Sequence, residues 1–341
     1  MSTHTSPDHI LKIGTGFFAS KVLLSAVELG LFTALGSDAK TGGEIERELG
    51  LHPRGTYDFL DALVALQLLE RDGDGAEARY GNTRDTRRFL DRASPDYVGG
   101  ILEMSNARLY RFWADLTPAL KTGLPQNELK HSGKPMFDEL YSDPARLEQF
   151  MGAMSGISLP NFRALAKKFD FSPYRTLVDV GGATGQLSCI VAEQHPHLRC
   201  RTLDLPVVQP IAQRRIAAAG LQERVTAGAL DFFTDEFPKA DVITMGMILH
   251  DWNLEKKKLL IRKAYDALPK GGAFIAVENI IDDARRENAF GLMMSLNMLI
   301  EFGDAFDFTG ADFTSWCVEA GFERCEIVHL NGPASAAIAY K

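Results

Sequence analysis

Residues 177–185 read Leu-Val-Asp-Val-Gly-Gly-Ala-Thr-Gly, and this stretch decides the fold. The apolar run at residues 176–180 is typical of a strand buried on both faces of a parallel sheet. The glycines after it predict a turn that a ligand can approach closely, and a helical pattern follows at residues 186–194. The next strand-like run ends at Asp204, about 20 residues beyond the turn, where an acid commonly binds a ribose. The stretch therefore predicts a nucleoside site on an α/β sheet.

The turn lacks the residues that bind phosphates. The dinucleotide fingerprint Gly-x-Gly-x-x-Gly, begun at Gly181, needs glycine where the chain has Ala183 and Gln186. A phosphate loop needs a lysine after Gly185, and none follows. This pattern favours a nucleoside without phosphates, of which S-adenosylmethionine is the commonest. Taken alone, the turn is also compatible with a strand–helix connection that binds nothing.

The bulk composition predicts a soluble, cytoplasmic protein of two domains. The chain has 341 residues and 45% hydrophobic content, enough to bury a large core. Its net charge of −8 argues against nucleic acid or an anionic membrane as partner. We expect no secretory signal and no membrane span, because the apolar residues 22–35 include Glu28. The four cysteines show no Cys-x-x-Cys spacing and are expected to be reduced thiols.

The first third of the chain predicts an interface with a second copy. Residues 10–35 are helical in pattern, and apolar side chains cover more than one face, whereas a surface helix of a monomer shows one stripe. A homodimer is the favoured explanation, and a core helix beneath its own domain is the alternative. Residues 41–49 and 53–66 then predict two short helices, and residues 68–75 and 79–83 predict a hairpin. This order is that of a winged helix, which raises the alternative of a DNA-binding regulator, but the second helix carries Asp58 and Asp61 beside Arg54.

Residues 85–170 are predicted to be helical throughout. Aromatic and methionine side chains recur at helical spacing in residues 97–120 and 136–154, and such stripes more often form plain core. Some of them are candidates for an adaptable apolar substrate pocket. The candidate substrate-binding residues are Trp113, Met151, Met247, Met294 and Asn297.

The remaining chain alternates strands with helices. Strands are expected at residues 225–229, 240–245, 273–277, 322–329 and 336–340, and helices at 207–219, 254–268, 290–300 and 311–320. We expect Lys256, Lys257 and Lys258 to form the solvated face of the helix at 254–268. This alternation predicts a doubly wound sheet whose ligands bind outside the carboxyl ends of its strands.

Several of these stretches together resemble the class I S-adenosylmethionine-dependent O-methyltransferases. They are the turn at 177–185, Asp-Leu-Pro from Asp204, Asp-Phe-Phe from Asp231, His-Asp-Trp from His250, Pro-Lys-Gly-Gly at 269–272 and Ala-Gly-Phe at 320–322. The likeness is to the caffeic acid, flavonoid and acetylserotonin types and their bacterial relatives, and it covers essentially the whole chain. It implies an α/β fold, a Rossmann-like doubly wound methyltransferase sheet preceded by an all-helical, winged-helix dimerisation domain. We divide the chain into a dimerisation domain at 1–100, a helical linker at 101–170 that contributes to the substrate pocket, and a catalytic domain at 171–341.

The resemblance also assigns a cofactor site. It implies that Gly181 lies under the methionine part of S-adenosylmethionine and that Asp204 binds the ribose hydroxyls. Asp231 and Phe232 would hold the adenine, and Ser158 would reach the cofactor from the middle helices. The family has a lysine four residues before its histidine, and this chain has Gly246 there.

Methyl transfer to a hydroxyl needs a base, because a neutral phenol is a poor nucleophile. Histidine suits this role near neutral pH, and His250 follows a strand end, so it is expected to face the ligand crevice. By resemblance, Glu278 and Asp307 are the two acids that bracket it, although the family usually has glutamate at the second position. A bland alternative is that His250-Asp-Trp starts a helix, with Asp251 or Asn253 as its N-cap.

We therefore predict an S-adenosylmethionine-dependent O-methyltransferase that acts on a small aromatic, secondary-metabolite-like hydroxyl compound. His250 is the predicted general base, and no metal is predicted. The first alternative is a C-methyltransferase that acts next to a keto group with a bound metal, to which Glu301 and His250 would contribute. The second alternative is a non-catalytic winged-helix regulator.

Overall fold

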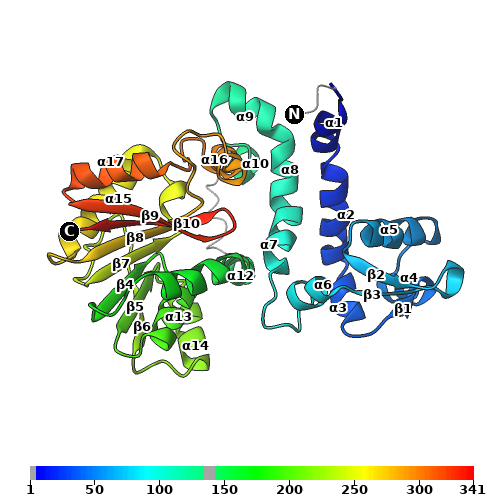
Figure 1. Ribbon diagram of the computed structural model, residues 1–341, viewed down its shortest axis with the longest axis horizontal. Coiled ribbons are helices and arrows are strands. Elements are labelled where there is room, and N and C mark those ends of the chain that lie inside the picture. The colour runs from blue at the N-terminus through cyan, green and yellow to red at the C-terminus, as the bar shows by residue number, and fades with distance from the viewer. Residues whose placement is uncertain (1–4, 134–142) are drawn as a thin grey trace. The chain divides into compact units, whose positions relative to one another are not determined.

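The computed structural model describes residues 5–133 and 143–341 and forms two compact units, Met1–Arg111 and Phe112–Lys341 (Figure 1). The first unit is mainly helical with a small sheet, and the second is a large sheet covered by helices. The boundary falls inside the segment 101–170 that the sequence assigns to a linker. The three-part division itself stays a prediction.

The first unit begins with helices that the sequence pattern had merged into one. They are α1 (Asp8–Gly14), α2 (Phe17–Glu28) and α3 (Leu31–Leu35). The chain turns before α2 and again at Gly30, whose φ of +72° suits glycine. The later part of this segment is buried in the unit's own core, including Val27, Leu31 and Phe32. The earlier part is exposed, with Ile13 at 68% and Phe18 at 61%.

A helical pair and a small antiparallel sheet complete the compact part of this unit. The helices are α4 (Gly42–Leu49) and α5 (Pro53–Ala65), and the strands are β1 (Lys40–Thr41), β2 (Leu69–Asp72) and β3 (Arg79–Asn82), with η1 (Gly75–Glu77) between the last two. Thr41 begins α4 with a capping box to Glu44. The helix, turn, helix and hairpin thus occur in the predicted order, and β1 pairs with β3 beside the hairpin. On α5, Arg54 is paired with Asp58, which leaves no isolated basic charge at that position.

Helices then continue along the chain. They are α6 (Arg84–Phe89), α7 (Gly99–Met104), the π-helical turn η2 (Ser105–Leu109), α8 (Tyr110–Phe112), η3 (Trp113–Asp115), α9 (Leu116–Thr122), α10 (Glu128–Ser132) and α12 (Pro144–Lys168). The segment predicted at 136–154 lies partly outside the described residues. The described parts are mainly helical, but residues 90–98 and 123–127 lie outside helices, so the prediction of helix throughout is wrong there.

The expectation that no segment could span a membrane is wrong by length and composition. Among the described residues, the helix Asp8–Glu28 has 21 residues and a mean hydropathy of 1.5 over its most apolar stretch, of which 17% is buried. Asp8 and Glu28 are charged ends of this segment, and the apolar stretch itself carries no more than two charges. A single apolar helix of this kind is weak evidence for a membrane, because core helices have the same composition.

The second unit holds one seven-stranded sheet in the order β6-β5-β4-β7-β8-β10-β9. Its strands are β4 (Thr176–Val180), β5 (Arg199–Asp204), β6 (Val225–Ala229), β7 (Val242–Gly246), β8 (Ala273–Glu278), β9 (Arg324–Asn331) and β10 (Ala334–Tyr340). Strands β4 to β8 pair in parallel, and β10 pairs antiparallel with both neighbours. The strand order reverses between β4 and β7, so their carboxyl ends flank a crevice. The predicted doubly wound sheet is confirmed.

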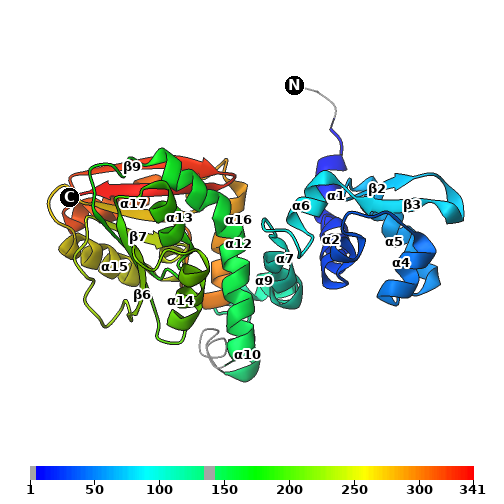
Figure 2. The same cartoon turned by 90° about the horizontal axis from the view of Figure 1, so that it is seen from below.

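Helices cover both faces of this sheet (Figures 1 and 2). They are α13 (Gln186–Gln194), α14 (Gln209–Ala218), η4 (Leu249–Asp251), α15 (Leu254–Ala267), α16 (Ala289–Phe302) and α17 (Gly310–Ala320). Helices α15 and α17 pack on one face, while α12 and α13 pack on the other, and each layer encloses its own apolar cluster. The predicted solvated face of α15 is wrong at Lys257, which is fully buried.

Candidate active site

The glycine turn after β4 is packed closely by residues from two other strand ends. Gly181 has φ +70°, and a Cβ atom there would lie 2.4 Å from Ile248 and 3.8 Å from the Phe232 ring. Ile248 follows β7 and leads directly into His250, and Phe232 follows β6. The turn, the candidate adenine residue and the candidate base therefore share one region at the carboxyl ends of the strands. The absence of a Cβ atom at Gly181 lets Ile248 pack directly against the turn, which ties the turn to the segment that carries His250.

Asp204 reaches back to this turn from the end of β5. Its Oδ2 accepts a hydrogen bond from the backbone N–H of Ala183 at 2.9 Å, and its Oδ1 accepts one from Leu205 at 2.7 Å. Burial raises the pKa of Asp204 above its ordinary value, and these two N–H donors oppose that rise. Each carboxylate oxygen keeps a second lone pair, so the group still has acceptor capacity for two ribose hydroxyls.

The remaining candidate cofactor residues come from the segment that follows β6 and from α12. Asp231 is half-buried, and its Oδ1 accepts from the N–H of Phe233 at 2.9 Å. Phe232 meets Trp252 edge to face, with ring centroids 5.9 Å apart. Ser158 is buried on α12, and that helix is joined to the turn by a hydrogen bond of 2.8 Å between the Ser155 and Thr184 hydroxyls.

Asp179 is a polar residue at the site that the sequence reading missed. It lies inside β4 and accepts a hydrogen bond from the Thr244 hydroxyl at 2.7 Å. A Cβ atom at Gly182 would lie 2.6 Å from its Oδ2, so the carboxyl group supports the turn from below. Burial raises the pKa of Asp179 to about 7. The sequence could have indicated Asp179, because an acidic residue is unusual inside an otherwise apolar strand.

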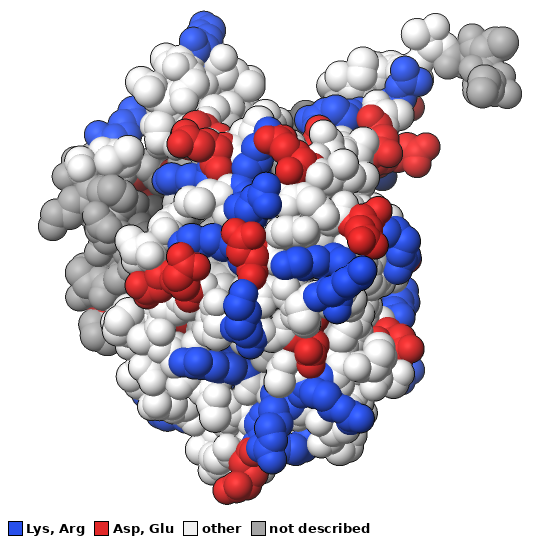
Figure 3. Space-filling view, turned by 90° about the vertical axis from the view of Figure 1, so that its left-hand side faces the viewer, with Lys and Arg blue, Asp and Glu red and all other residues white. Residues whose placement is uncertain are grey.

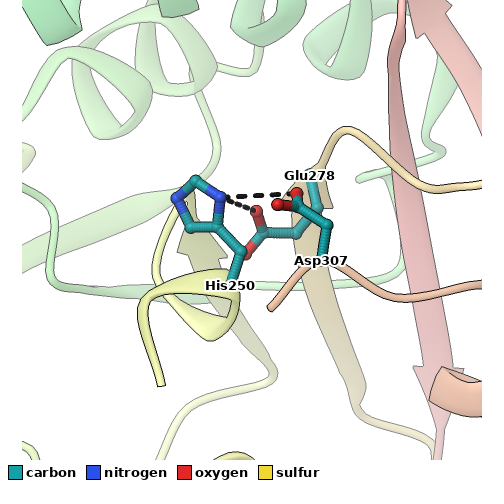
Figure 4. A group of neighbouring side chains, drawn as sticks. All are labelled: His250, Glu278 and Asp307. Atoms are coloured by element: carbon teal, nitrogen blue, oxygen red, sulfur yellow. Dashed lines mark ion pairs between the residues drawn. The ribbon is translucent and has the colours of Figure 1, made fainter. Parts of the chain in front are cut away.

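The structure brings the three predicted catalytic residues together (Figure 4). His250 lies on η4, Glu278 at the end of β8 and Asp307 in the loop before α17. The His250 Nδ1 atom is 3.4 Å from Asp307 Oδ1 and 3.9 Å from Glu278 Oε2, and all three side chains are buried. Glu278 also fixes the turn that carries the histidine, because its Oε1 accepts from the N–H groups of Ile248 at 3.1 Å and Leu249 at 2.9 Å.

The electrostatic setting favours a protonated His250 in the resting protein. Burial alone lowers the pKa of His250, but Glu278, Asp251 and Asp307 outweigh it and raise that pKa to about 10. Burial in turn raises the pKa of Glu278 to about 7, which the histidine opposes. The cluster thus stores a proton next to the cofactor turn, and the imidazole must lose it before it can act as a base.

Asp251 belongs to this cluster and does not cap the following helix. Asn253 is the N-cap of α15, since its side chain accepts from the N–H of Lys256 at 3.1 Å. Asp251 Oδ1 lies 3.2 Å from His250 Nε2, and burial raises the pKa of Asp251 to about 6. From the sequence, Asp251 is equally compatible with capping the next helix and with contacting His250, because it is adjacent to both.

The candidate substrate residues are only partly brought together. The indole N–H of Trp113 donates to Asn297 Oδ1 at 2.9 Å, and Met294 is half-buried one turn earlier on α16. Met247 follows β7 with φ +56°, an uncommon value for a side chain of this size. Met151 instead packs with Leu147 and Val208, in a cluster that also contacts Ala183 of the glycine turn.

The metal pairing of Glu301 with His250, which the sequence offers only as an alternative, does not form a cluster in the described part of the chain. There, the group with suitable ligand atoms is His250, Glu278 and Asp307, whose atoms lie within 4.8 Å of one another. Glu301 is buried beside Asn127, whose Nδ2 donates to its backbone oxygen at 2.7 Å and to its Oε2 at 3.3 Å. At Gly246, where the family has a lysine, the Phe162 ring lies 3.1 Å from the position of a Cβ atom and occupies that space.

Comparisons with known proteins bear on the family of the chain. The family model of the O-methyltransferase domain matches residues 113–323, and that of the O-methyltransferase dimerisation domain matches residues 11–92. The tetracenomycin polyketide synthesis 8-O-methyl transferase TcmO of Streptomyces glaucescens is 39% identical over 344 residues, covering 100% of this chain and 99% of its own. The N,N-dimethyltransferase OxyT of Streptomyces rimosus is 35% identical over 314 residues, covering 92% and 90%. Human N-acetylserotonin methyltransferase, solved with S-adenosylmethionine, superposes with a TM-score of 0.91 at 27% identity, covering 100% and 99% of the two chains.

The chain therefore belongs to the O-methyltransferase family, with its own dimerisation domain. It is an S-adenosylmethionine-dependent O-methyltransferase. The predicted family, enzyme class and cofactor are confirmed.

Proposed function

We propose that the enzyme methylates a hydroxyl group of a small aromatic compound and that His250 is the general base. The observation that carries this proposal is the buried His250, held between three carboxylates next to the cofactor turn. When bound, S-adenosylmethionine supplies an electrophilic methyl group on a sulfonium. Gly181, Asp204, Asp231, Phe232 and Ser158 are the residues that we assign to holding it.

Each residue of the cluster has a distinct part in the proposed chemistry. His250 accepts the hydroxyl proton at Nε2 as the new carbon–oxygen bond forms, and the Asp251 carboxylate that lies 3.2 Å from Nε2 in this structure must give way to the acceptor. Asp307 faces Nδ1 and stabilises the imidazolium that results, while Glu278 holds both the ring and its turn. The imidazole loses its resting proton more readily beside a cation, so cofactor binding favours the active form of the base.

The residues near the site support an aromatic acceptor. Trp113, Met247, Met294 and Asn297 offer flat or adaptable apolar surface with one hydrogen-bonded amide. The human neighbour is named for N-acetylserotonin, which carries its hydroxyl on an aromatic ring. OxyT is named for methylation of nitrogen, so the identity of the acceptor atom needs a direct test.

We also propose that the enzyme is a homodimer through the exposed apolar surface of α1 and α2. The dimerisation-domain match begins at residue 11, inside this surface. A single chain leaves this apolar surface exposed to water, and a second copy packed against it would bury that area. The predicted cytoplasmic location fits the four cysteines, all of which are free thiols.

Replacing His250 by Ala tests the proposed function. We expect the variant to bind S-adenosylmethionine with unchanged affinity by calorimetry and to lose at least about 100-fold in turnover, the usual range for a general base. The probes are N-acetylserotonin and a panel of polycyclic phenols, with products located by mass spectrometry and NMR. Wild-type-like turnover in His250→Ala would remove the base from the mechanism, and methyl on nitrogen would change the acceptor class.

The carbon-methylating alternative stays open for one reason. His250, Glu278 and Asp307 are spaced closely enough to hold a metal ion. Metal analysis of the purified enzyme and turnover in the presence of EDTA decide between the two. The O-methyl proposal expects full turnover without stoichiometric metal, whereas chelator-sensitive activity with methyl on carbon would support the alternative.

A further inference from the structure

Lys257 occupies a position that the fold would normally give to an apolar residue. The buried stripe of α15 consists of Lys257, Leu260, Ile261, Ala264 and Ala267, at the spacing of a helix face that packs on a sheet. Lys257 has no exposed surface at all. Its neighbours Lys256 and Lys258 point outward, and Lys258 pairs with Glu319 at 2.6 Å. Burying an ammonium group is costly, so this one needs a reason to be there.

The contacts of the ammonium lie against the catalytic segment. Lys257 Nζ donates to the backbone oxygen of Trp252, two residues beyond His250. It also lies 3.7 Å from the centroid of the Phe306 ring and 5.9 Å from that of Phe308. These two rings flank Asp307 in the sequence, so one cation contacts the residue on each side of the acid that faces His250.

The charge of Lys257 also matches the charges around it. Burial lowers the pKa of Lys257 to about 8, while Glu278, Asp307, Asp251 and Asp304 oppose that change. Glu278, Asp307 and Asp251 are also the acids that face His250 from the end of β8, the loop before α17 and η4. Glu301, on α16, acts on Asp251 in addition. Lys257 is thus the buried lysine that offsets an otherwise acidic cluster.

We propose that Lys257 is a positioning residue for methyl transfer, which fixes Asp307 through the Phe306 and Phe308 rings and balances the negative charge around His250. This inference rests on the proposed role of His250 as base. Nothing in the chemistry requires Lys257 to touch the cofactor or the acceptor. Its loss should therefore alter the rate and its pH dependence without altering cofactor affinity.

Lys257→Met tests the inference, because methionine keeps most of the length of the side chain and removes its charge. Removing one partner of a buried charge cluster destabilises the fold, but methionine keeps the packing volume, so we expect a less stable protein that still unfolds cooperatively and binds S-adenosylmethionine with normal affinity. With the cation gone, the acids hold the His250 proton more tightly. We expect kcat at pH 7 to fall about tenfold and the acid limb of the pH–rate profile to move up by about one pH unit.

Two further variants make the result decisive. Lys258→Met changes the next residue on the same helix and should leave kcat, KM and the pH profile unchanged. Phe306→Leu keeps the ammonium but removes the nearer ring, and we expect it to lower kcat with little change in KM for the cofactor. If Lys257→Met folds and its pH profile coincides with wild type, the inference is wrong. If Lys257→Met does not fold, an unchanged kcat in Phe306→Leu contradicts it instead.

Failure of the inference can be told apart from failure of the proposed function. If His250→Ala loses turnover while Lys257→Met and Phe306→Leu match wild type, His250 is the base and Lys257 has no part in positioning. If His250→Ala keeps wild-type turnover, the proposed function fails first, and the inference falls with it.

Discussion

At the scale of single residues, the chemistry depends on how tightly the proton of His250 is held. Its two ring nitrogens lie 3.2 Å from Asp251 and 3.4 Å from Asp307. Opposite charges at such distances in a buried site favour the protonated form. The same carboxylates stabilise the imidazolium after proton transfer. Before proton transfer, they lower the fraction of His250 that is neutral and can act as a base.

This balance predicts the pH dependence of the enzyme. The pKa of His250 is raised to about 10 in the free protein, so the neutral fraction grows with pH across the range 7–9, and kcat/KM should rise with it. Asp307→Asn removes one attracting charge, which lowers the pKa of His250 and should move the acid limb to lower pH by about one unit. Steady-state kinetics from pH 6 to 10 check this. A limb that is unmoved in Asp307→Asn would show that this carboxylate does not control the proton.

Gly181 offers a second test at this scale, with a matched control in the same chain. Gly181→Ala places a methyl group 2.4 Å from Ile248 at φ +70°, so the turn that we assign to the cofactor must shift. Gly220 has a similar φ of +66° with open space around it. Both alanine variants should lose on the order of 1 kcal/mol of stability from the backbone conformation.

Calorimetry with S-adenosylmethionine separates the two glycine variants. We expect Gly181→Ala to bind at least about tenfold more weakly and Gly220→Ala to bind as wild type does. Equal affinities in the two variants would place the cofactor away from this turn.

The sequence predicts His250, Glu278 and Asp307 as a group, and the structure brings their side chains together. It could not predict the parts of Asp251 and Lys257. Asp251 had an equally good explanation as a helix cap, and only the position of Asn253 decides between them. Lys257 belongs to a run of three lysines whose individual orientation depends on the phase of α15, and a shift of one residue along a helix exchanges a buried side for a solvated one.

At the scale of elements, the sheet was predictable because its central strands are buried on both faces. The predicted bounds of β4 and β6, residues 176–180 and 225–229, are those of the structure, and β4 is buried along most of its length. The first helices were less predictable. The pattern at 10–35 looks like one helix because apolar residues fill several faces, yet the chain bends at Gly30 and divides that surface into a buried and an exposed part.

The exposed apolar part of α1 and α2 predicts a dimer interface. Charged substitutions in this surface should dissociate the dimer. Phe17 is 52% exposed and Phe18 is 61% exposed, with their rings packed edge to face. Replacing both with Asp would bury two charges in a dimer interface, so we expect monomers by light scattering at micromolar concentration. The control is Val318→Asp on α17, an exposed apolar residue of the second unit. A wild-type monomer, or a dimer that persists in the double variant, would contradict the assignment.

At the scale of the whole molecule, charges of both signs share the surface. Lysine and arginine are interspersed with aspartate and glutamate over the face shown in Figure 3. A mixed surface of this kind provides little attraction for a polyanion, in line with the net charge of −8. The division at residues 111 and 112 keeps the chemistry within one compact unit, because the catalytic cluster and the glycine turn both belong to Phe112–Lys341.

The central claim is that His250 removes the hydroxyl proton during methyl transfer, and chemical rescue tests it most directly. The measurement is the single-turnover rate of His250→Ala, saturated with S-adenosylmethionine and acceptor, as imidazole is added. We predict that the rate rises in proportion to free imidazole base, whereas the wild-type rate does not change. A variant rate that is already close to wild type, or that ignores imidazole while the cofactor remains bound, would contradict the claim.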